Sequence, residues 1–289
     1  MARELAALGV LKLPGAAVLF EILGRVRGDA TKIKAGNYEF ESPTTPLKLL
    51  KKMTSGDATQ TAVRFIDGWT FKQVRQALDT HEALKHDTQD MSNPGIARAL
   101  GIADAQPEGW IFPETFHFSR GTSDLAVLTR AHRLMLKHLN AQWNKRAVDL
   151  PLATPYEALI LASIVEKETS KATDRALVSS VFINRLRIKM RLQTDPTVIY
   201  GMGDEFDGNL RRRNVQTDTP WNTYTRSGLP PTPIAMPGLA SIQAAVNPET
   251  SKMLYFVARG DGSSQFSSTL DEHNAAVNKY RRSAKNEAR

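Results

Sequence analysis

Two glutamates stand at the end of the most apolar segment of this sequence, where a carboxyl group can act as an acid or a base. Glu166 and Glu168 follow directly on the run 158–165, which is apolar except for one serine. Against an apolar surface, the charged form of a carboxyl is disfavoured, so its pKa rises and it can remain a proton donor near neutral pH. The pattern therefore predicts a general acid here.

The spacing of these two glutamates excludes a facing pair. Residues 154–157 (TPYE) form a capping box with proline at the first helical position, and they predict a helix that runs into both carboxylates. At about 100° per residue, Glu168 lies over Ile164 and Leu161, whereas Glu166 lies on nearly the opposite side. Glu168 is the better candidate for the acid. The alternative is that both are solvated residues of the last helical turn.

Two polar loops follow this helix and carry groups that can hold a sugar. Residues 191–201 read as a turn after a second capped helix over 174–190, and residues 221–231 combine aromatic, amide and hydroxyl groups with stiffening prolines. Loops of this kind often bind ligands, although each residue can instead stabilise its own loop. The candidates for holding a sugar or orienting the acid are Gln193, Thr194, Asp195, Asn222 and Tyr224. Glu108 and Glu114 are weaker candidates.

Composition narrows the chemistry further. The 289 residues contain no cysteine, which excludes disulfides, thiolate-bound metals and a thiol nucleophile. The six histidines show no metalloprotease spacing, and no phosphate-binding or dinucleotide motif is present, so we expect neither metal nor cofactor. The net charge of +8 favours a polyanionic partner: nucleic acid, an anionic membrane surface or an acidic polysaccharide.

The elements that must position these residues predict an α+β fold. A short helix from residue 46, a strand over 63–66 and a helix over 71–78 that begins after Thr70 predict a small module, with a further strand at 36–40. The predicted organisation is a helical segment over 1–33, a small module over 34–80, a linker over 81–107 and a catalytic domain over 108–289. The small module is either a structural subdomain or a part that contacts glycan.

Several motifs resemble those of the endolytic murein transglycosylases, the YceG-like family. They are residues 108–115 (EGWIFPET), 162–169 (ASIVEKET), 181–186 (VFINRL), 192–201 (LQTDPTVIYG), 224–231 (YTRSGLPP) and 255–258 (YFVA). The resemblance covers nearly the whole chain in the same order. It implies a LysM-like module, which falls at 34–80, ahead of a mixed, helix-containing catalytic domain. It implies that Glu168 is the catalytic residue, with Thr169 similar to the hydroxyl residue that follows it in other lytic transglycosylases.

The resemblance also implies an enzyme of the bacterial cell envelope. Such an enzyme cleaves the bond between N-acetylmuramic acid (MurNAc) and N-acetylglucosamine (GlcNAc) inside nascent glycan strands, leaves 1,6-anhydroMurNAc ends and meets peptidoglycan synthases and other envelope proteins. The family has an N-terminal transmembrane helix, whereas Lys12, Pro14 and Glu21 interrupt the apolar stretch 5–23. We therefore expect an anchor outside this chain, in the inner membrane, with the catalytic domain in the periplasm or outside.

Three other functions remain open from the sequence. A lysozyme-like hydrolase would leave reducing ends, and a non-catalytic protein would bind peptidoglycan without cleaving it. Nucleic-acid binding would use the basic runs 211–213 and 281–282, but these lack a recognition motif and are more simply explained as solvated surface.

Overall fold

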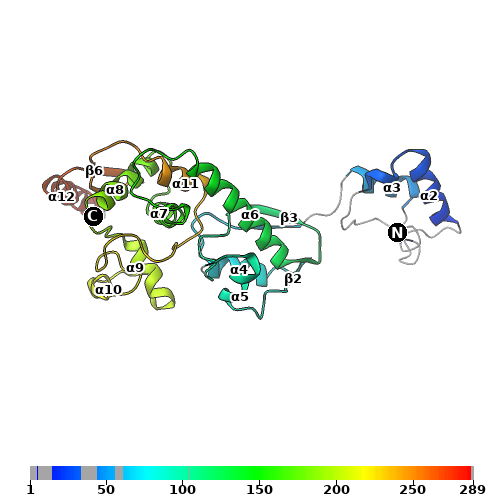
Figure 1. The fold of residues 1–289 in the computed structure, drawn as a ribbon, viewed down its shortest axis with the longest axis horizontal. Coiled ribbons are helices and arrows are strands. Elements are labelled where there is room, and N and C mark those ends of the chain that lie inside the picture. Colours follow the sequence, from blue (N-terminus) through cyan, green and yellow to red (C-terminus); the bar gives the residue numbers. More distant parts are fainter. Residues whose placement is uncertain (1–4, 6–14, 34–43, 56–60, 104, 288–289) are drawn as a thin grey trace. The chain divides into compact units, whose positions relative to one another are not determined.

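The computed structural model describes residues 5, 15–33, 44–55, 61–103 and 105–287 (Figure 1). The strand predicted at 36–40 lies outside these residues. The described chain is a mixed α+β fold of helices with three two-stranded sheets, which agrees with the predicted class. It divides into two compact units, each of which is described by itself.

The first unit contains the described residues of 1–63, 81–87 and 115–127. Helix α2 (Ala16–Val26) contacts helix α3 (Pro46–Ser55), and a 3-10 turn, η1 (Ala30–Lys32), lies between them in sequence. Their shared core consists of Phe20, Leu49, Leu50 and Met53. Helix α2 lies within the helical segment predicted over 1–33, and α3 begins at residue 46, as predicted.

The strands of the first unit pair across a long stretch of sequence. Strand β1 (Thr61–Arg64) pairs with β3 (Thr115–Phe118), and β2 (Leu84–Lys85) pairs in parallel with β4 (Thr122–Ser123). The partner of β1 therefore lies beyond residue 80, where the small module was predicted to end. The predicted linker 81–107 contains strand β2 and the whole of helix α5 (Asn93–Leu100), whose Ile96 is fully buried.

The second unit contains the described residues of 64–80, 88–114 and 128–289. Its elements are α4 (Phe71–Asp79), α5 (Asn93–Leu100), most of α6 (Asp124–Trp143), α7 (Pro155–Glu168), α8 (Arg175–Arg187), α9 (Asp195–Met202), η2 (Gly203–Glu205), α10 (Arg212–Gln216), α11 (Leu239–Val246), β5 (Tyr255–Ala258), β6 (Ser264–Ser267) and α12 (Leu270–Glu287). None of the helices within the described ranges is both long and apolar enough to span a membrane.

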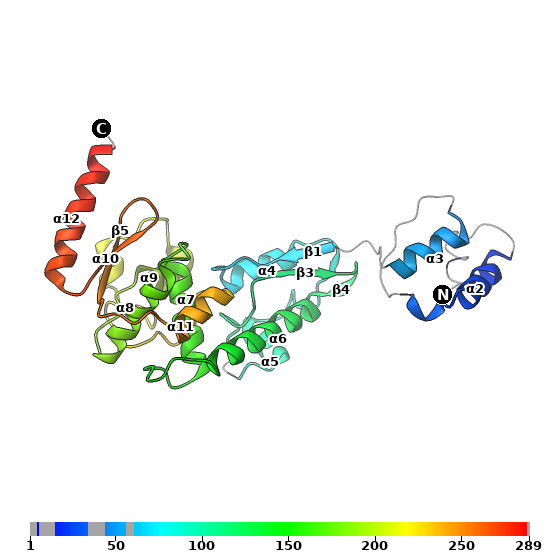
Figure 2. The same ribbon diagram turned by 90° about the horizontal axis from the view of Figure 1, so that it is seen from above.

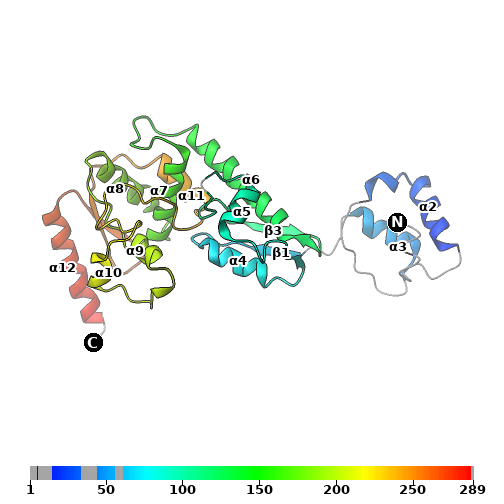
Figure 3. The ribbon, with the colours of Figure 1, turned by 60° about the horizontal axis from the view of Figure 1, so that its bottom comes forward.

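Helix α7 lies at the centre of the second unit's core (Figure 3). Thr154 caps it by accepting a hydrogen bond from the Glu157 amide at 3.2 Å, as the capping box predicts. Every residue from 158 to 165 is buried, because α8 and α11 pack against the helix. A helix surrounded by protein needs no polar stripe, which explains its nearly continuous apolar sequence. The helix ends at Glu168, at the edge of this core.

A hairpin and the last helix complete the second unit. Strand β5 pairs antiparallel with β6, with Phe256 opposite Phe266, and α12 contacts both strands (Figure 2). Strand β5 also contacts α8. The hairpin thus brings Tyr255 and the first turn of α12 to the same side of the unit as the end of α7.

Candidate active site

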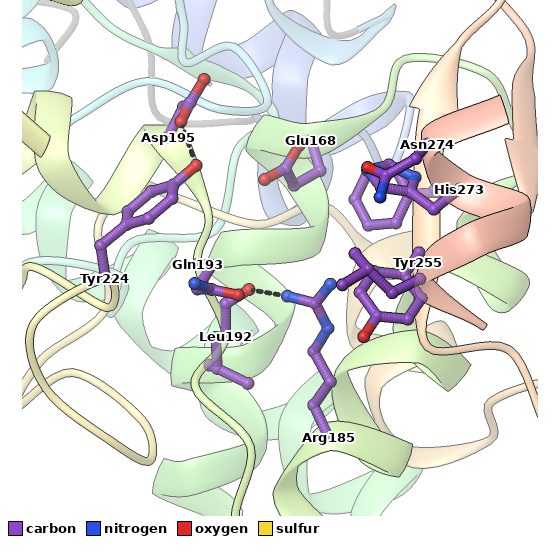
Figure 4. A pocket seen from close by; sticks show the side chains of 11 residues that line it. Glu168, Arg185, Leu192, Gln193, Asp195, Tyr224, Tyr255, His273 and Asn274 are labelled. Carbon is purple, nitrogen blue, oxygen red and sulfur yellow. Dashed lines mark hydrogen bonds between the residues drawn. The ribbon is translucent and has the colours of Figure 1, made fainter. Parts of the chain in front are cut away.

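Glu168 faces a cavity of about 440 Å³ in the second unit (Figure 4). The pKa of its carboxyl is raised to about 7, mainly by burial at the end of α7 and in part by the charge of the neighbouring Asp195. The Thr194 hydroxyl donates a short hydrogen bond to Oε1, and this bond and the charge of Arg185 oppose the rise. Near neutral pH, a large share of Glu168 is therefore protonated and can donate a proton.

Glu166 lies on a different side of α7, as its helical position predicts. Its carboxylate accepts a hydrogen bond from the Gly238 amide at 3.0 Å and lies 3.8 Å from the guanidinium of Arg175. These contacts tie α7 to the start of α11 and to α8. Glu166 is not among the residues that line the cavity, so the two glutamates do not form a facing pair.

The predicted turn over 191–201 is wrong in its second half, which forms helix α9. Asp195 is its first residue and Pro196 lies in its first turn, a pattern that favours helix initiation. Just before the helix, Gln193 has a φ of 49°, a conformation that costs a non-glycine residue free energy. The Gln193 amide donates to the Thr223 carbonyl, and the Thr194 amide donates to the Thr223 hydroxyl. These bonds hold Thr194 against the acid.

Three of the predicted sugar-binding residues line the cavity beside Glu168. They are Gln193, Asp195 and Tyr224. The Tyr224 hydroxyl donates to Asp195 Oδ1 at 2.6 Å, and burial together with this neighbouring carboxylate raises the pKa of the phenol (Figure 4). Thr194 is buried, and its hydroxyl donates to the carboxyl of Glu168. Asp195 is thus held by Tyr224, and the acid is held by Thr194.

Asn222 does not line the cavity, although it was predicted to contact sugar. Its side chain is fully buried and donates to the carbonyls of Val215 and Thr217 at 2.9 and 2.6 Å, while its Oδ1 accepts from the Tyr224 amide. All three bonds are made within residues 215–224. Asn222 therefore fixes the loop that presents Tyr224, which matches the loop-stabilising interpretation.

Four further cavity residues with polar side chains were not predicted from the sequence. They are Arg185, Tyr255, His273 and Asn274. Arg185 stands in the apolar core face of α8, and an isolated cation in such a face is a sequence signal that marks a special environment. Tyr255 and His273 stack with their ring centroids 5.2 Å apart. Arg185 and Tyr255 lie in the motifs 181–186 and 255–258, but nothing in the sequence predicts that the hairpin and α12 meet α7, so neither was placed at the site.

Glu108 lines a second cavity of about 720 Å³, and Glu114 lines neither cavity. The Glu108 carboxylate accepts hydrogen bonds from the Phe71 amide at the start of α4, at 3.0 and 3.2 Å, and from the Tyr200 hydroxyl at 3.1 Å. Burial raises the pKa of Glu108 to about 7. Trp221 and Phe206 add aromatic surface to this second cavity.

The geometry around Glu168 suits chemistry that needs a single acid. The other carboxylate in the cavity, Asp195, accepts the Tyr224 hydroxyl. Thr169, the residue after the acid, is buried and its hydroxyl accepts from the Lys171 amide at 3.1 Å. Within the described residues, no three histidine, aspartate or glutamate side chains gather in a way that could hold a metal ion. The site can donate a proton from Glu168 and take it back.

Comparison with known proteins identifies relatives over most of the chain. A sequence model of the YceG-like family matches residues 1–279. A Bacillus subtilis (strain 168) protein named endolytic murein transglycosylase is 34% identical over an alignment of 284 positions, and the match covers 89% of this chain and 76% of that protein. A Streptococcus pneumoniae protein of the same name (serotype 2, strain D39) is 27% identical over 86% of this chain. The chain spans only half the length of that relative.

A solved structure shares the fold. The crystal structure of a YceG-like protein from Listeria monocytogenes is similar with a TM-score of 0.63 and 30% sequence identity. The similarity covers 90% of this chain and 89% of the other. With the family match over residues 1–279 and the 34% identical relative, it shows that this chain belongs to the YceG-like family.

Proposed function

We propose that this chain is a lytic transglycosylase of peptidoglycan and that Glu168 is its general acid and base. The names of the Bacillus and Streptococcus relatives support the activity and the substrate. The single observation that carries the residue assignment is the carboxyl of Glu168, which faces a cavity, is held by Thr194 and has its pKa raised to about 7. A single acid of this kind can perform both proton transfers of the reaction.

The reaction needs one carboxyl group because the substrate supplies its own nucleophile. Protonated Glu168 donates to the glycosidic oxygen between MurNAc and GlcNAc as the bond from C1 to that oxygen breaks. The resulting carboxylate takes the proton of the MurNAc C6 hydroxyl, whose oxygen attacks C1 and closes a 1,6-anhydro ring. An intramolecular attack has a high effective molarity, and it requires no water. Hydrolysis with two carboxylates would need a second carboxylate to act as base or nucleophile, whereas Asp195, the other carboxylate in the cavity, accepts the Tyr224 hydroxyl.

We assign the cavity residues to the substrate as follows. Gln193, Asp195 and Tyr224 hold the sugar, because they present amide, carboxylate and aromatic groups beside the acid. Thr194 orients Glu168, and Asn222 holds the loop that carries Tyr224.

The test is a digestion of purified peptidoglycan followed by mass spectrometry. The wild-type chain should release fragments with 1,6-anhydroMurNAc ends, and Glu168→Gln should release none. Glu249→Gln, which changes an exposed carboxylate that is not part of the cavity, is the matched control and should behave as the wild type. Anhydro ends from Glu168→Gln would contradict the assignment.

The same digestion separates the rival functions. A lysozyme-like hydrolase would give reducing ends in place of anhydro ends. A non-catalytic protein would bind the glycan and give neither product, and its function would survive Glu168→Gln. Nucleic-acid binding would appear as salt-dependent binding to DNA.

We further propose that the second cavity helps to hold the glycan strand. The LysM-like module implied by the family resemblance supports this, because α4, which was predicted inside that module, contributes Phe71 and Lys72 to the cavity. Aromatic rings, an ammonium group and the Glu108 carboxyl suit a sugar. Phe206→Ala should then raise KM for long glycan strands and leave kcat unchanged. An unchanged KM would contradict this role.

Peptidoglycan lies outside the cytoplasmic membrane, so we propose that the protein works there. A membrane anchor would hold it at the inner membrane, beside the synthases that make nascent strands. The net charge of +8 would support contact with anionic lipids and with the carboxylates of peptidoglycan. Fractionation of cells that express the protein tests the location, and recovery in the cytoplasm would refute it.

A further inference from the structure

Arg185 is a buried cation without a carboxylate partner in the described part of the chain. Only 7% of the residue is exposed. Its Nε donates to the Leu254 carbonyl and its Nη1 to the Leu192 carbonyl, both at 2.7 Å, and the guanidinium lies 5.2 Å from the centroid of the Tyr255 ring. No aspartate or glutamate among the described residues lies within ion-pair distance of it. These contacts fix its position, but none of them carries a negative charge.

A guanidinium stays protonated even when burial lowers its pKa, as it does here. A buried charge with only neutral partners is costly, because the water that would solvate it is removed. We therefore expect such a charge to stabilise a nearby group that becomes negatively charged. Arg185 and Glu168 line the same cavity, and Figure 4 shows the guanidinium between Leu192 and Tyr255, with Glu168 facing the same space.

We propose that Arg185 is a positioning residue that supplies the counter-charge for the Glu168 carboxylate formed during the reaction. This inference rests on the proposed function of Glu168. When Glu168 gives its proton to the glycosidic oxygen, a negative charge forms in the cavity, and Arg185 stabilises it without any rearrangement. When the C6 hydroxyl returns a proton to Glu168, the carboxyl is neutral again. Arg185 transfers no proton in either step.

The other charged and titratable groups around Glu168 do not supply this counter-charge. Asp195 on α9 carries the same sign as the carboxylate, and Tyr224 is engaged with Asp195. Tyr255 on β5 carries a phenol, which cannot supply a positive charge. Desolvation and the charge of Arg185 lower the pKa of His273 on α12, which disfavours its cationic form. Among the groups that line the cavity, Arg185 is therefore the fixed positive charge.

The direct test measures the titration of Glu168 by NMR in protein labelled with ¹³C at glutamate side-chain carboxyls, with Glu168→Gln used to assign the signal. Removing a nearby positive charge disfavours the carboxylate, so the pKa of Glu168 should rise by about one unit in Arg185→Gln. Glutamine keeps an amide donor for the Leu192 or Leu254 carbonyl. Arg185→Lys, which keeps the charge, should remain within about half a unit of the wild type.

A kinetic test uses the same variants. The basic limb of the pH profile of kcat/KM should move to higher pH in Arg185→Gln, kcat should fall at least tenfold, and Arg185→Lys should restore part of both. Arg187→Gln is the matched control, because this exposed arginine lies on the same helix and does not line the cavity. It should leave the Glu168 titration and the pH profile unchanged. A purely structural role of Arg185 would lower activity without moving the pH profile.

One measurement needs no substitution at Arg185. In the wild type, the ¹⁵N shifts of the Arg185 guanidinium should follow the ionisation of Glu168, and in Glu168→Gln this step should disappear. Shifts that do not respond, or an unchanged Glu168 titration in folded Arg185→Gln, would overturn the inference. Both readouts are independent of turnover, so they remain valid if the digestion shows no anhydro ends and the proposed function fails.

Discussion

The protonation of Glu168 has a consequence for stability that can be measured without substrate. The pKa of this carboxyl is raised from 4.5 to about 7 on folding, mainly by burial. The folded protein therefore holds a proton between these two pH values that the unfolded chain has released. This contribution favours the folded state below pH 4.5 and is lost as the pH rises through 7. At 1.36 kcal/mol per unit, the loss is about 3 kcal/mol.

Glu168→Gln removes this titration and keeps a similar shape, with an amide oxygen that can still accept from Thr194. Relative to the wild type, the variant should therefore gain about 3 kcal/mol of unfolding free energy between pH 4.5 and pH 8. Glu108 also has a raised pKa, but it titrates in both proteins and cancels from the difference.

Urea unfolding followed by tryptophan fluorescence is the appropriate assay. All four tryptophans, Trp69, Trp110, Trp143 and Trp221, lie in the second unit, so the signal reports on the unit that contains Glu168. Glu249→Gln should follow the wild type at every pH. A difference between wild type and Glu168→Gln that stays constant from pH 4.5 to pH 8 would refute the raised pKa and the argument for a protonated acid.

Three further substitutions test the supports of the site. Thr194→Val removes the hydroxyl that favours the carboxylate form of Glu168, so the basic limb of the pH–rate profile should move up by about one pH unit. Thr194→Ser keeps the hydroxyl and should leave the limb in place. An unmoved limb in the valine variant would contradict the bond to Glu168. Asn222→Ala leaves two carbonyls and an amide without their partner, so the unfolding free energy measured by urea titration should fall by about 3 kcal/mol. A loss below about 1 kcal/mol would mean that other contacts hold the loop. Gly109→Ala places a Cβ against the ring of Pro233, whereas Gly101→Ala, at nearly the same φ, meets nothing within 4 Å. Urea titration should show the first to be less stable than the second by about 2 kcal/mol, and equal losses would contradict the tight packing at Gly109.

The parts of the fold that depend on local sequence were predictable. The cap at Thr154, the apolar run of α7 and the two faces of Glu166 and Glu168 follow from helix geometry and from the residues themselves. The capping box that Thr70 forms at the start of α4 is likewise predictable from local sequence. These features depend on neighbours within a few residues, so they can be read without knowledge of the tertiary structure.

The parts that depend on distant contacts could not be predicted in this way. Strand β1 pairs with a segment some fifty residues later, and the sequence carries no signal for that choice. The polar run 191–201 reads as a turn because its hydrogen-bonding groups dominate, yet Asp195 and Pro196 begin a helix. Asn222 looks like a ligand-binding amide, and only the carbonyls that surround it in the folded chain reveal its structural use.

The first turn of α12 lines the cavity through His273 and Asn274, while the acid stands at residue 168. During synthesis, Glu168 therefore leaves the ribosome about a hundred residues before His273 and Asn274, which complete the lining of the cavity. Until residue 274 is made and α12 reaches the hairpin, Glu168 is open to water on that side. Water favours the carboxylate, so the partly made enzyme would hold a deprotonated glutamate. The proton donor is a property of the finished chain.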